Sequence, residues 1–564
     1  MQHKIKILFI ISIAVFACSQ KSYSQKSLVA RQVDKNTFAR KQAGKDKVIS
    51  YLQQRSKNGV VNLFEFNADA LKDDAFFLNV FPGESIMVTK QKVDKRSGDN
   101  FTWYGVINGT NGHEGSIAMV YLNGELSGNL NYKSGNYSMN PMGKGAFSLY
   151  EIDFKKAPVD DDAPGMIDSH EKINKQGEPA TEAAAAAACN LRVLIAITPS
   201  AENFIKNSLG FSSLTQFALQ AVAETNQAYI NSAVNIYMEL ASSVRVNYSE
   251  SGNFSTDLTR FRTTSDGYMD EIHNYRNLYA ADVNLLIINN SSACGLASTI
   301  MANATTAFAA AHYDCTLGYY SFAHEIGHLQ GLRHNPEVDG STSPYAYGHG
   351  YVYSPGGWRT VMAYNYNGET RIQYFSNPNV TYGGVPMGTA ATHNNARVLN
   401  ETAGTVANFR NASSTLAINS AGAVVNDESS DAIATSEVIL QDGFEATGSS
   451  QFSARIISCV GPSIAADNTD AVNAKEDESA DSRSALAIYP TVTSGRVFIS
   501  TDLSELKRAD IIVTDNSGRI VSRSVNNAGK KTISMDLGHL PNGIYFIQAK
   551  QGEKIITRKV IINH

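Results

Sequence analysis

The sequence predicts a multidomain chain in which an α/β (α+β) central domain lies between a β-rich N-terminal region and a C-terminal antiparallel β-sandwich. The chain has 564 residues, too many for a single core. A buried-strand pattern, a long helical pattern and a second buried strand follow one another at 192–198, 213–241 and 282–288. Residues 60–154 and 485–564 instead alternate apolar and polar side chains in short runs, which is typical of antiparallel sheets.

The composition is that of a folded protein that does not bind nucleic acid. Hydrophobic residues make up 43% and charged residues 18%, which excludes wholesale disorder. The net charge is −5, so no basic field is available to attract a polyanion. Five cysteines allow one or two disulfides in an oxidising compartment but are too few for a disulfide framework.

The N-terminus predicts export. Lys4 and Lys6 precede an apolar run over 7–17, and small polar residues follow, so we interpret 1–24 as a secretory signal peptide. Cys18 leaves a lipoprotein signal as an alternative. The run is too short to span a bilayer, which needs about 20 residues, and no later segment is long and apolar enough. We therefore expect no transmembrane segment.

The segments on either side of the central domain contain no candidate catalytic cluster. Residues 25–157 are β-rich, and we predict that they form a propeptide. Residues 158–188 are rich in Asp, Pro, Gly, Lys and Ala, which indicates a linker with the maturation site. Residues 411–484 become small, polar and acidic, and we predict an acidic linker with a small β-repeat module at 438–456, acting as a spacer.

The central domain contains the motif HExxHxxGxxH. His324 and His328 share one helix face about 6 Å apart along the axis, and Glu325 lies within reach of the same side. His334 can join them only if the helix ends and the chain folds back, and Gly331 is the residue that can adopt the left-handed turn. Three imidazoles with an open fourth position predict a single catalytic Zn²⁺, with Glu325 as the base that activates its bound water.

This extended motif resembles that of the metzincin zinc endopeptidases. The resemblance implies a methionine turn downstream, and Thr360-Val-Met-Ala-Tyr supplies it, with Met362 as an apolar floor beneath the histidines. Tyr364 matches the position at which some metzincins place a tyrosine that reaches the metal, as a fifth ligand, or the oxyanion. The alternative role for Tyr364 is packing beside the turn.

The surroundings of the motif are similar to secreted bacterial reprolysin-like enzymes, near the peptidyl-Asp metalloendopeptidases. The resemblance covers about 190–410, and we place the catalytic domain at 189–410. Asn335 departs from the reprolysin pattern, which has aspartate directly after the third histidine. The matching stretches are 321–328, 347–351, 358–364, 374–378 and 407–410.

The cysteines and remaining histidines of this domain receive structural predictions. Cys294 and Cys315 flank residues 306–312, which we expect to line the cleft and pair with extended substrate. Export favours a disulfide between them. Cys189 could cap the zinc, pair with Cys459 or stay free. The other candidates for chemistry, each expected to be structural, are His312, His349 and His393.

The C-terminal residues 485–564 resemble the C-terminal sorting domain of the Bacteroidetes type IX secretion system. The matching stretches are Tyr489-Pro, Asp515-Asn-Ser-Gly-Arg and Leu540-Pro-Asn-Gly-Ile-Tyr-Phe-Ile. The resemblance implies that this secretion machinery is a partner and that the chain crosses both membranes, to be released or attached to the outer cell surface. The alternative is a generic adhesive β-sandwich.

These observations together predict a secreted zinc metalloendopeptidase that acts on proteins or peptides. A zymogen form follows from the predicted propeptide. Calcium is a further candidate ion, but no residue pattern supports a site for it. One alternative is a surface adhesin or binding protein with a vestigial protease core. A second is a zinc hydrolase acting on a non-peptide substrate.

Overall fold

The computed structural model describes residues 26–158 and 190–457, apart from short gaps at 43, 97–98, 110–111, 365–367 and 426, and most of the strands between 486 and 562. The chain divides into two compact units, residues 1–464 and 465–564. The predicted signal peptide and nearly all of the predicted linker 158–188 lie outside the described residues. Within the described part, no helix has the length and apolar character needed to cross a bilayer.

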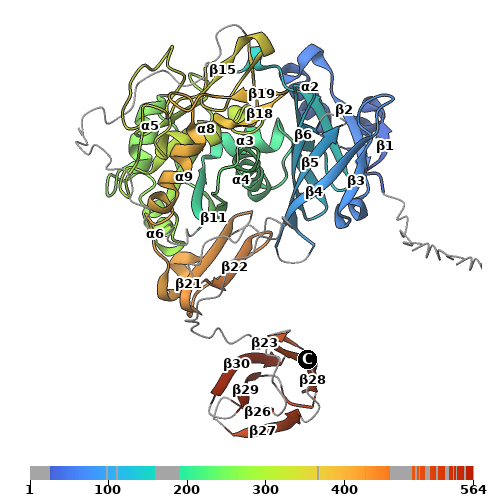
Figure 1. Ribbon diagram of the computed structural model, residues 1–564, viewed down its shortest axis with the longest axis vertical. Coiled ribbons are helices and arrows are strands. Elements are labelled where there is room, and N and C mark those ends of the chain that lie inside the picture. The colour runs from blue at the N-terminus through green and yellow to red at the C-terminus, as the bar shows by residue number, and fades with distance from the viewer. Residues whose placement is uncertain are drawn as a thin grey trace, which may run out of the picture. The chain divides into compact units, whose positions relative to one another are not determined.

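The N-terminal region is one nine-stranded sheet in which every neighbouring pair is antiparallel (Figure 1). A hydrogen bond of 2.8 Å from Leu28 N to Phe77 O brings the two edge strands together, so the sheet nearly closes on itself. Trp103 and Phe76 pack in its interior, with ring centroids 4.9 Å apart. The elements are β1 (Val29–Val33), α1 (Lys35–Lys41), α2 (Lys45–Arg55), β2 (Asn62–Phe66), β3 (Ala75–Leu78), β4 (Ile86–Lys95), β5 (Phe101–Gly109), β6 (Gly112–Leu122), β7 (Glu125–Tyr132), β8 (Gly135–Pro141) and β9 (Ala146–Glu151).

The central region is built on an eight-stranded mixed sheet with the order β13-β14-β12-β10-β11-β21-β20, and β22 pairs with β21. The strands are β10 (Leu191–Ile197), β11 (Met238–Arg245), β12 (Val283–Ile288), β13 (Gly295–Ala297), β14 (Phe308–His312), β20 (Ser413–Ile418), β21 (Ser429–Leu440) and β22 (Gln451–Ile456). The helices are α3 (Pro199–Asn207), α4 (Leu214–Asn231), α5 (Phe254–Arg262), α6 (Glu271–Leu278), α7 (Tyr313–Thr316), α8 (Ser321–Leu329) and α9 (Asn395–Val406). The predicted strand–helix–strand order is present, but the helix ends at Asn231 and β11 begins within the range predicted as helical.

The prediction that residues 306–312 pair with substrate is wrong. Residues 308–312 of this range form β14, which has β12 on one side and β13 on the other, so the backbone groups of the strand are already paired. The edge of the sheet is the three-residue strand β13, which runs antiparallel to β14. Two short sheets follow α8 in the chain: β15 (Val352–Tyr353), β16 (Trp358–Arg359) and β17 (Thr370–Arg371) form one, and β18 (Asn377–Tyr382) and β19 (Val385–Met387) form the other.

Helix α4 joins the N-terminal and central regions into one unit, because it packs against β6 on one side and β11 on the other (Figure 1). Almost all of its residues are buried, as expected for a helix with no solvent-facing side. Gln216 and Gln220 donate side-chain hydrogen bonds to Val120 O (3.4 Å) and Ala118 O (3.5 Å) of β6. These bonds tie two carbonyl oxygens of β6, an interior strand of the nine-stranded sheet, to α4.

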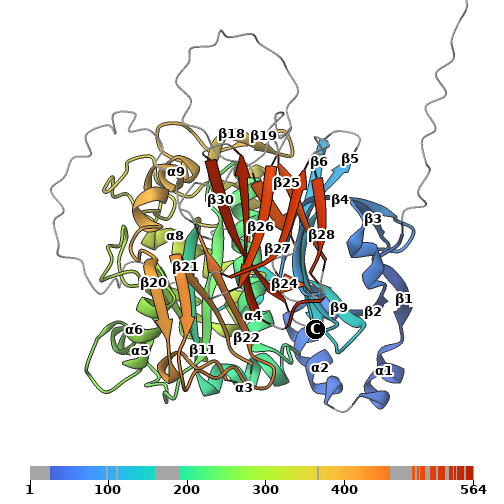
Figure 2. The same cartoon turned by 90° about the horizontal axis from the view of Figure 1, so that it is seen from below.

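The segment predicted to be a spacer instead extends the central sheet. Strand β21 pairs antiparallel with β11, with Ser242 opposite Ser430 and Ser243 opposite Ser429. The hydroxyl oxygens of these two pairs lie 2.9 and 2.8 Å apart. Figure 2 shows β20, β21 and β22 beside β11. The open edge of β11 is thus covered, which is one way proteins prevent pairing with other chains. The rest of the predicted acidic linker lies outside the described residues.

The C-terminal unit has two layers of strands, β23-β25-β28 and β24-β30-β29-β26-β27. All neighbouring pairs are antiparallel except β24 and β30. Met535 of the smaller sheet belongs to the same buried cluster as Ile511, Val513 and Ile547 of the larger one. The strands are β23 (Leu486–Tyr489), β24 (Val492–Thr493), β25 (Arg496–Thr501), β26 (Ala509–Asp515), β27 (Ile520–Asn526), β28 (Thr532–Asp536), β29 (Gly543–Gln551) and β30 (Lys554–Ile562).

Candidate metal centre and active site

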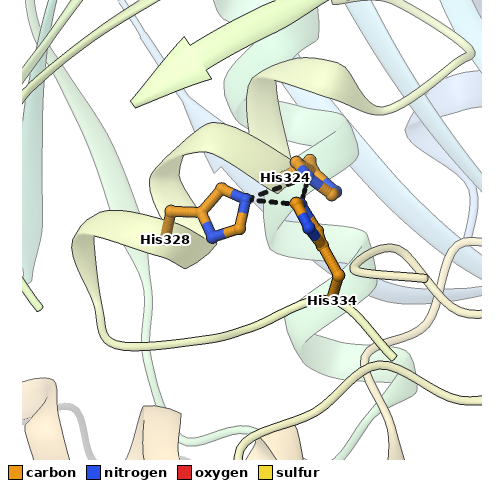
Figure 3. A group of neighbouring side chains, drawn as sticks. All are labelled: His324, His328 and His334. Atoms are coloured by element: carbon orange, nitrogen blue, oxygen red, sulfur yellow. Dashed lines mark hydrogen bonds between the residues drawn. The ribbon is translucent and has the colours of Figure 1, made fainter. Parts of the chain in front are cut away.

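Three buried histidines converge on one point at helix α8 (Figure 3). The Nε2 atoms of His324 and His328 lie 3.1 Å apart, and the Nε2 atom of His334 lies 3.1 Å from the first and 3.0 Å from the second. Nitrogens at this mutual spacing can all reach a single ion at roughly 2.0–2.1 Å. Among the described residues, these three form the group of metal-ligating side chains that could hold an ion.

The hydrogen bonds behind the rings fix which nitrogen faces the centre. His324 Nδ1 lies 2.8 Å from Val361 O, and His328 Nδ1 lies 2.9 Å from Leu332 O. A carbonyl only accepts, so each Nδ1 carries the proton and each Nε2 presents a lone pair. Lone pairs facing each other in a buried site repel unless a cation lies between them, so this donor set fits a metal ion.

The chain folds back after α8 as the motif spacing requires. Gly331 adopts a φ of 103°, in the left-handed region that favours glycine. Leu332 N then donates to Gly327 O at 3.0 Å, which closes the helix end and directs the chain toward His334. His334 is held through its backbone, because its carbonyl accepts a 2.7 Å hydrogen bond from His349 Nδ1. His349 thus supports a ligand from behind.

The methionine turn lies directly under α8. Met362 is fully buried, and a Cβ built on Gly327 would come within 2.6 Å of its Sδ, so glycine is required in the helix there. Tyr364 follows two residues later, with its ring centroid 4.1 Å from that of His334. Its backbone N donates to Asn335 Oδ1 at 2.9 Å. Asn335, where the sequence departs from the reprolysin pattern, therefore ties the third histidine to the turn.

Glu325 is 1% exposed and lies against the edge strand of the central sheet. A Cβ on Gly295, the first residue of β13, would come within 2.2 Å of Glu325 Oε1. Gly295 is thus part of the site because it has no side chain, a role that sequence reasoning missed. The available signal was a glycine directly after Cys294.

A disulfide joins Cys294 to Cys315 and so connects the start of β13 to α7, the helix before α8. His312 lies beside it, with its backbone N donating to Cys294 O at 3.0 Å, and burial lowers the pKa of this histidine. His393 Nδ1 lies 2.7 Å from Thr392 Oγ1. Neither histidine belongs to the metal-ligating group. Cys189 and Cys459 fall outside the described residues.

The N-terminal region contacts the segment that leads into α8. Arg55 Nε lies 3.0 Å from Asp314 Oδ1, and its Nη2 donates to Asp314 O at 2.6 Å. Tyr320, the residue before α8, donates its hydroxyl to Asn129 Oδ1 at 2.9 Å. Glu224 of α4 accepts from Gly318 N at 2.8 Å, and burial raises its pKa to about 7. Sequence reasoning missed all of these contacts, because none of these residues belongs to a recognisable motif and their partners are far away in the sequence.

Known proteins share both this central region and the tail. Residues 188–376 match Metallo-peptidase family M12, and residues 487–563 match the secretion system C-terminal sorting domain. The peptidyl-Asp metalloendopeptidase of Xanthomonas campestris pv. campestris is 42% identical over 340 residues, covering 58% of this chain and 80% of that protein. This chain belongs to the same family of metalloendopeptidases. The corresponding protein of Stenotrophomonas maltophilia (strain K279a) is 43% identical over 354 residues, covering 58% of this chain and 81% of that protein. That of Pseudomonas fragi is 46% identical over 189 residues, covering 33% of this chain and 100% of that protein.

The metalloendopeptidase family and the histidine geometry agree. The family match spans α8 and the methionine turn, so His324, His328 and His334 form the metal-binding triad of a peptide-hydrolysing enzyme. The predicted metalloendopeptidase is confirmed and is favoured over an adhesin or a non-peptide hydrolase. The predicted sorting domain is confirmed as well, which indicates export to the cell surface or beyond.

Proposed function

We propose that this metalloendopeptidase holds one zinc ion on His324, His328 and His334, with Glu325 as its catalytic base. The carrying observation is the set of three buried Nε2 atoms that face one another within 3.1 Å. All-nitrogen ligation favours zinc over calcium or magnesium, which take oxygen ligands. Among the described residues no second group of three such side chains supports a calcium site.

Zinc, when bound, supplies a Lewis acid that polarises the scissile carbonyl and acidifies water. Glu325 takes the proton from the attacking water and later delivers it to the leaving amine. Its carboxylate lies over Gly295 of β13, so the base lies beside the open edge of the sheet. An extended peptide that adds to β13 as a further strand would bring its carbonyl to this carboxylate.

Tyr364 is proposed to stabilise the oxyanion that forms on the attacked carbonyl. Its ring packs on that of His334, so its hydroxyl is carried next to the metal ligands. A group that acts only on the transition state changes kcat and leaves KM nearly unchanged. Replacement by phenylalanine tests this, since a packing role would be kept by the phenyl ring.

The substrates are proposed to be proteins and peptides cut beside aspartate. The relatives that carry the name peptidyl-Asp metalloendopeptidase support this preference, because two of them are aligned over about four-fifths of their own length. The side of the aspartate on which cleavage falls is left to the product analysis below.

The remaining segments are proposed to serve delivery. Residues 25–157 act as a propeptide, cleavage within 158–188 releases the catalytic domain, and residues 485–564 engage the type IX secretion machinery for release or attachment at the outer cell surface. The sorting-domain match supports the last step. The position of Pro158 supports cleavage within 158–188. Its carbonyl oxygen lies 3.6 Å from Cys294 Sγ, so this segment begins next to β13, the edge strand proposed to bind substrate.

The experiment compares wild type with Glu325→Gln, using Glu271→Gln on the exposed face of α6 as a matched control. We expect wild type and control to bind one zinc per chain and to cleave Asp-containing peptides, with loss of cleavage in a chelator. Glu325→Gln should keep zinc and the melting temperature but lose at least about 1000-fold in kcat/KM. Zinc content by elemental analysis and cleavage sites by mass spectrometry provide the readout. Full activity in Glu325→Gln would disprove the assignment.

A further inference from the structure

Helix α4 presents a stripe of five polar side chains to the N-terminal sheet. Successive members are separated by four, four, three and four residues, so they lie on one face of the helix. Four of them are neutral amides, and the middle one is a carboxylate. The members of this α4 stripe are Gln216, Gln220, Glu224, Gln227 and Asn231.

The four amides of the stripe all bond to the N-terminal sheet. The first two donate to carbonyl oxygens of β6, as described above. Gln227 Nε2 donates to Gln91 Oε1 of β4 at 3.3 Å, and Asn231 Nδ2 donates to Ser116 Oγ of β6 at 3.0 Å. The α4 stripe is therefore the surface of the helix that the N-terminal sheet covers.

Glu224 lies in the middle of the stripe and is 3% exposed. Its Oε2 accepts from Gly318 N at 2.8 Å, and its Oε1 accepts from Gln220 Nε2 at 3.3 Å. Gln220 Oε1 in turn accepts from Ser127 Oγ of β7 at 3.1 Å. The carbonyl oxygen of Gly318 accepts from Asn136 Nδ2 of β8 at 2.6 Å. Both donors to the carboxylate are thus neutral, and both are bonded to the N-terminal sheet.

Few ionisable groups face Glu224, and none of the described ones forms an ion pair with it. Arg55 of α2 is the cation that acts on it, and Arg55 pairs with Asp314 at 3.0 Å. Glu224 acts in turn on the hydroxyls of Tyr150 on β9 and Tyr320 before α8, and burial raises the pKa of both above 10. On α8 itself the ionisable side chains are those of the metal site.

The other described elements that pack on α4 add no counter-charge. Strands β5, β6 and β7 present neutral side chains to the helix, namely Tyr104, Ser116, Ala118, Val120 and Ser127. The charged groups of α3 and β11 form ion pairs of their own, Glu202 with Lys206 and Arg245, and Glu239 with Arg192. Among the described residues the carboxylate is therefore buried without a counter-ion, which disfavours its charged form.

The covered and uncovered states of the stripe differ in the pKa of Glu224. Burial raises this pKa from 4.5 to about 7 while the N-terminal sheet is in place. Once the sheet has left, water reaches the carboxylate and its pKa falls back toward the ordinary value. Between these values the covered state binds more protons than the uncovered state, so the affinity of the N-terminal region for α4 falls as the pH rises.

We propose that the α4 stripe is a pH-dependent docking surface for the N-terminal region, which stays bound at acidic pH after the linker is cut and separates when Glu224 ionises. This inference rests on the proposed cleavage within 158–188. The cut breaks the covalent connection, and the pH then decides when the N-terminal region leaves the catalytic domain. The amides of the stripe suit a separable contact, because water can take over their hydrogen bonds after separation.

Apolar contacts beside the stripe hold the N-terminal region in place while Glu224 is neutral. Leu219 and Ala223 of α4 share a buried cluster with Val120 and Leu122 of β6. These contacts do not depend on pH, since none of the four side chains ionises. Ionisation of Glu224 therefore acts against a constant apolar attraction and sets the pH at which the contact weakens.

The test uses the full chain with Glu325→Gln, which lacks the proposed catalytic base and so does not digest itself. The recognition sequence of a site-specific protease replaces the alanine run 183–188, so that the linker can be cut on demand. Size-exclusion chromatography of the cut chain at several concentrations, from pH 5 to pH 8, then gives the Kd between the two fragments. Because the cut is supplied, the result does not depend on whether the wild type is cut in this linker.

We expect the Kd to rise by up to about tenfold per pH unit, by roughly 70-fold between pH 5 and pH 8, and to level off above pH 7. Glu224→Gln, added to this chain, supplies a neutral side chain of the same shape and should remove the rise. Glu271→Gln on the exposed face of α6 is the matched control and should keep it. A Kd that does not change with pH, or a rise of the same size in Glu224→Gln, would overturn the proposal.

Two further variants keep the test decisive if Glu224→Gln does not fold. Gln220→Leu removes a donor to the charged carboxylate, so the pH at which the Kd levels off should move upward. Gln227→Leu removes an amide of the same stripe that does not bond to Glu224, and it should weaken docking at every pH without moving that point. Equal behaviour of these two variants would contradict the proposal. A secreted wild type with no break in 158–188 would instead refute the proposed maturation and leave the docking measurement intact.

Discussion

The nine-stranded N-terminal sheet is antiparallel throughout, whereas the central sheet is built on the parallel strands β10, β12 and β14. Antiparallel neighbours are joined by short hairpins, but parallel neighbours need long crossovers. The crossovers and the segments after the last parallel strand are the places where α4, α7 and α8 occur. The metal-ligating histidines lie after the last parallel strand, while in the uncleaved chain the N-terminal region contacts the segment that leads into α8. The residues proposed for catalysis therefore belong to the central region, and the N-terminal region makes only structural contacts.

A matched pair of glycine substitutions tests this division and should have the largest effect. In Gly295→Ala the new Cβ meets Glu325 Oε1 at 2.2 Å, so the base must move. We expect a loss of about 100-fold or more in kcat/KM, since a shift of about 1 Å can cost that much. Gly115→Ala in β6 places a Cβ 2.0 Å from Asn131 O, an equally severe clash in the other sheet.

Gly115→Ala should lower the yield of folded, exported protein. The activity per mature molecule should remain normal, because residues 25–157 are absent from the proposed mature enzyme. Active-site titration of purified mature protein makes the comparison. Normal turnover in Gly295→Ala would contradict the placement of the base against β13.

The buried ion pair between the regions should have the next largest effect. Removing one partner of such a pair costs about 3–5 kcal/mol, because the other charge stays buried. We expect Arg55→Met to destabilise the uncleaved protein by roughly this amount, measured by urea unfolding. Lys57→Met, whose partner Glu151 is also in the N-terminal region and whose side chain is 54% exposed, is the control and should cost less than about 1 kcal/mol.

The smallest predicted effect is a pH dependence of the folding stability, caused by Glu224 of α4, the helix between the two sheets. Burial raises the pKa of Glu224 from 4.5 to about 7 in the folded state. Between these values the folded chain binds more protons than the unfolded chain, so this group lowers the stability as the pH rises from about 4.5 to 7. Above pH 7 the full effect of Glu224 is reached, and it lowers the free energy of unfolding by an amount on the order of 3 kcal/mol.

Glu224→Gln should remove this contribution. Thermal unfolding of the uncleaved protein at pH 5 and pH 8 should show a smaller loss of stability in Glu224→Gln than in wild type. An identical pH dependence in the two proteins would show that Glu224 is charged in the folded state throughout this range.

The three metal-binding histidines were predictable from the sequence, but the strands that form or cover the edges of the central sheet were not. The spacing of His324, His328 and His334 around Gly331 specifies its own geometry, because helix periodicity and one left-handed residue determine it. The position of β14 inside the sheet depends on pairing with β13, which is only three residues long and has no alternating pattern to detect. The pairing of Arg359 with Arg371 could not be predicted for the same reason, because β16 and β17 are only two residues long each and lie side by side only in the folded chain.

The pairing of β21 with β11 sets where the chain can be shortened. A protein ended after residue 457 keeps every strand of the central sheet and lacks only the segment ahead of the tail and the tail itself. A protein ended at residue 410, where the catalytic domain was predicted to end, exposes the backbone of β11 and the serine hydroxyls that β21 covers. Such a bare edge invites pairing between molecules, so the shorter protein should self-associate where the longer one stays monodisperse.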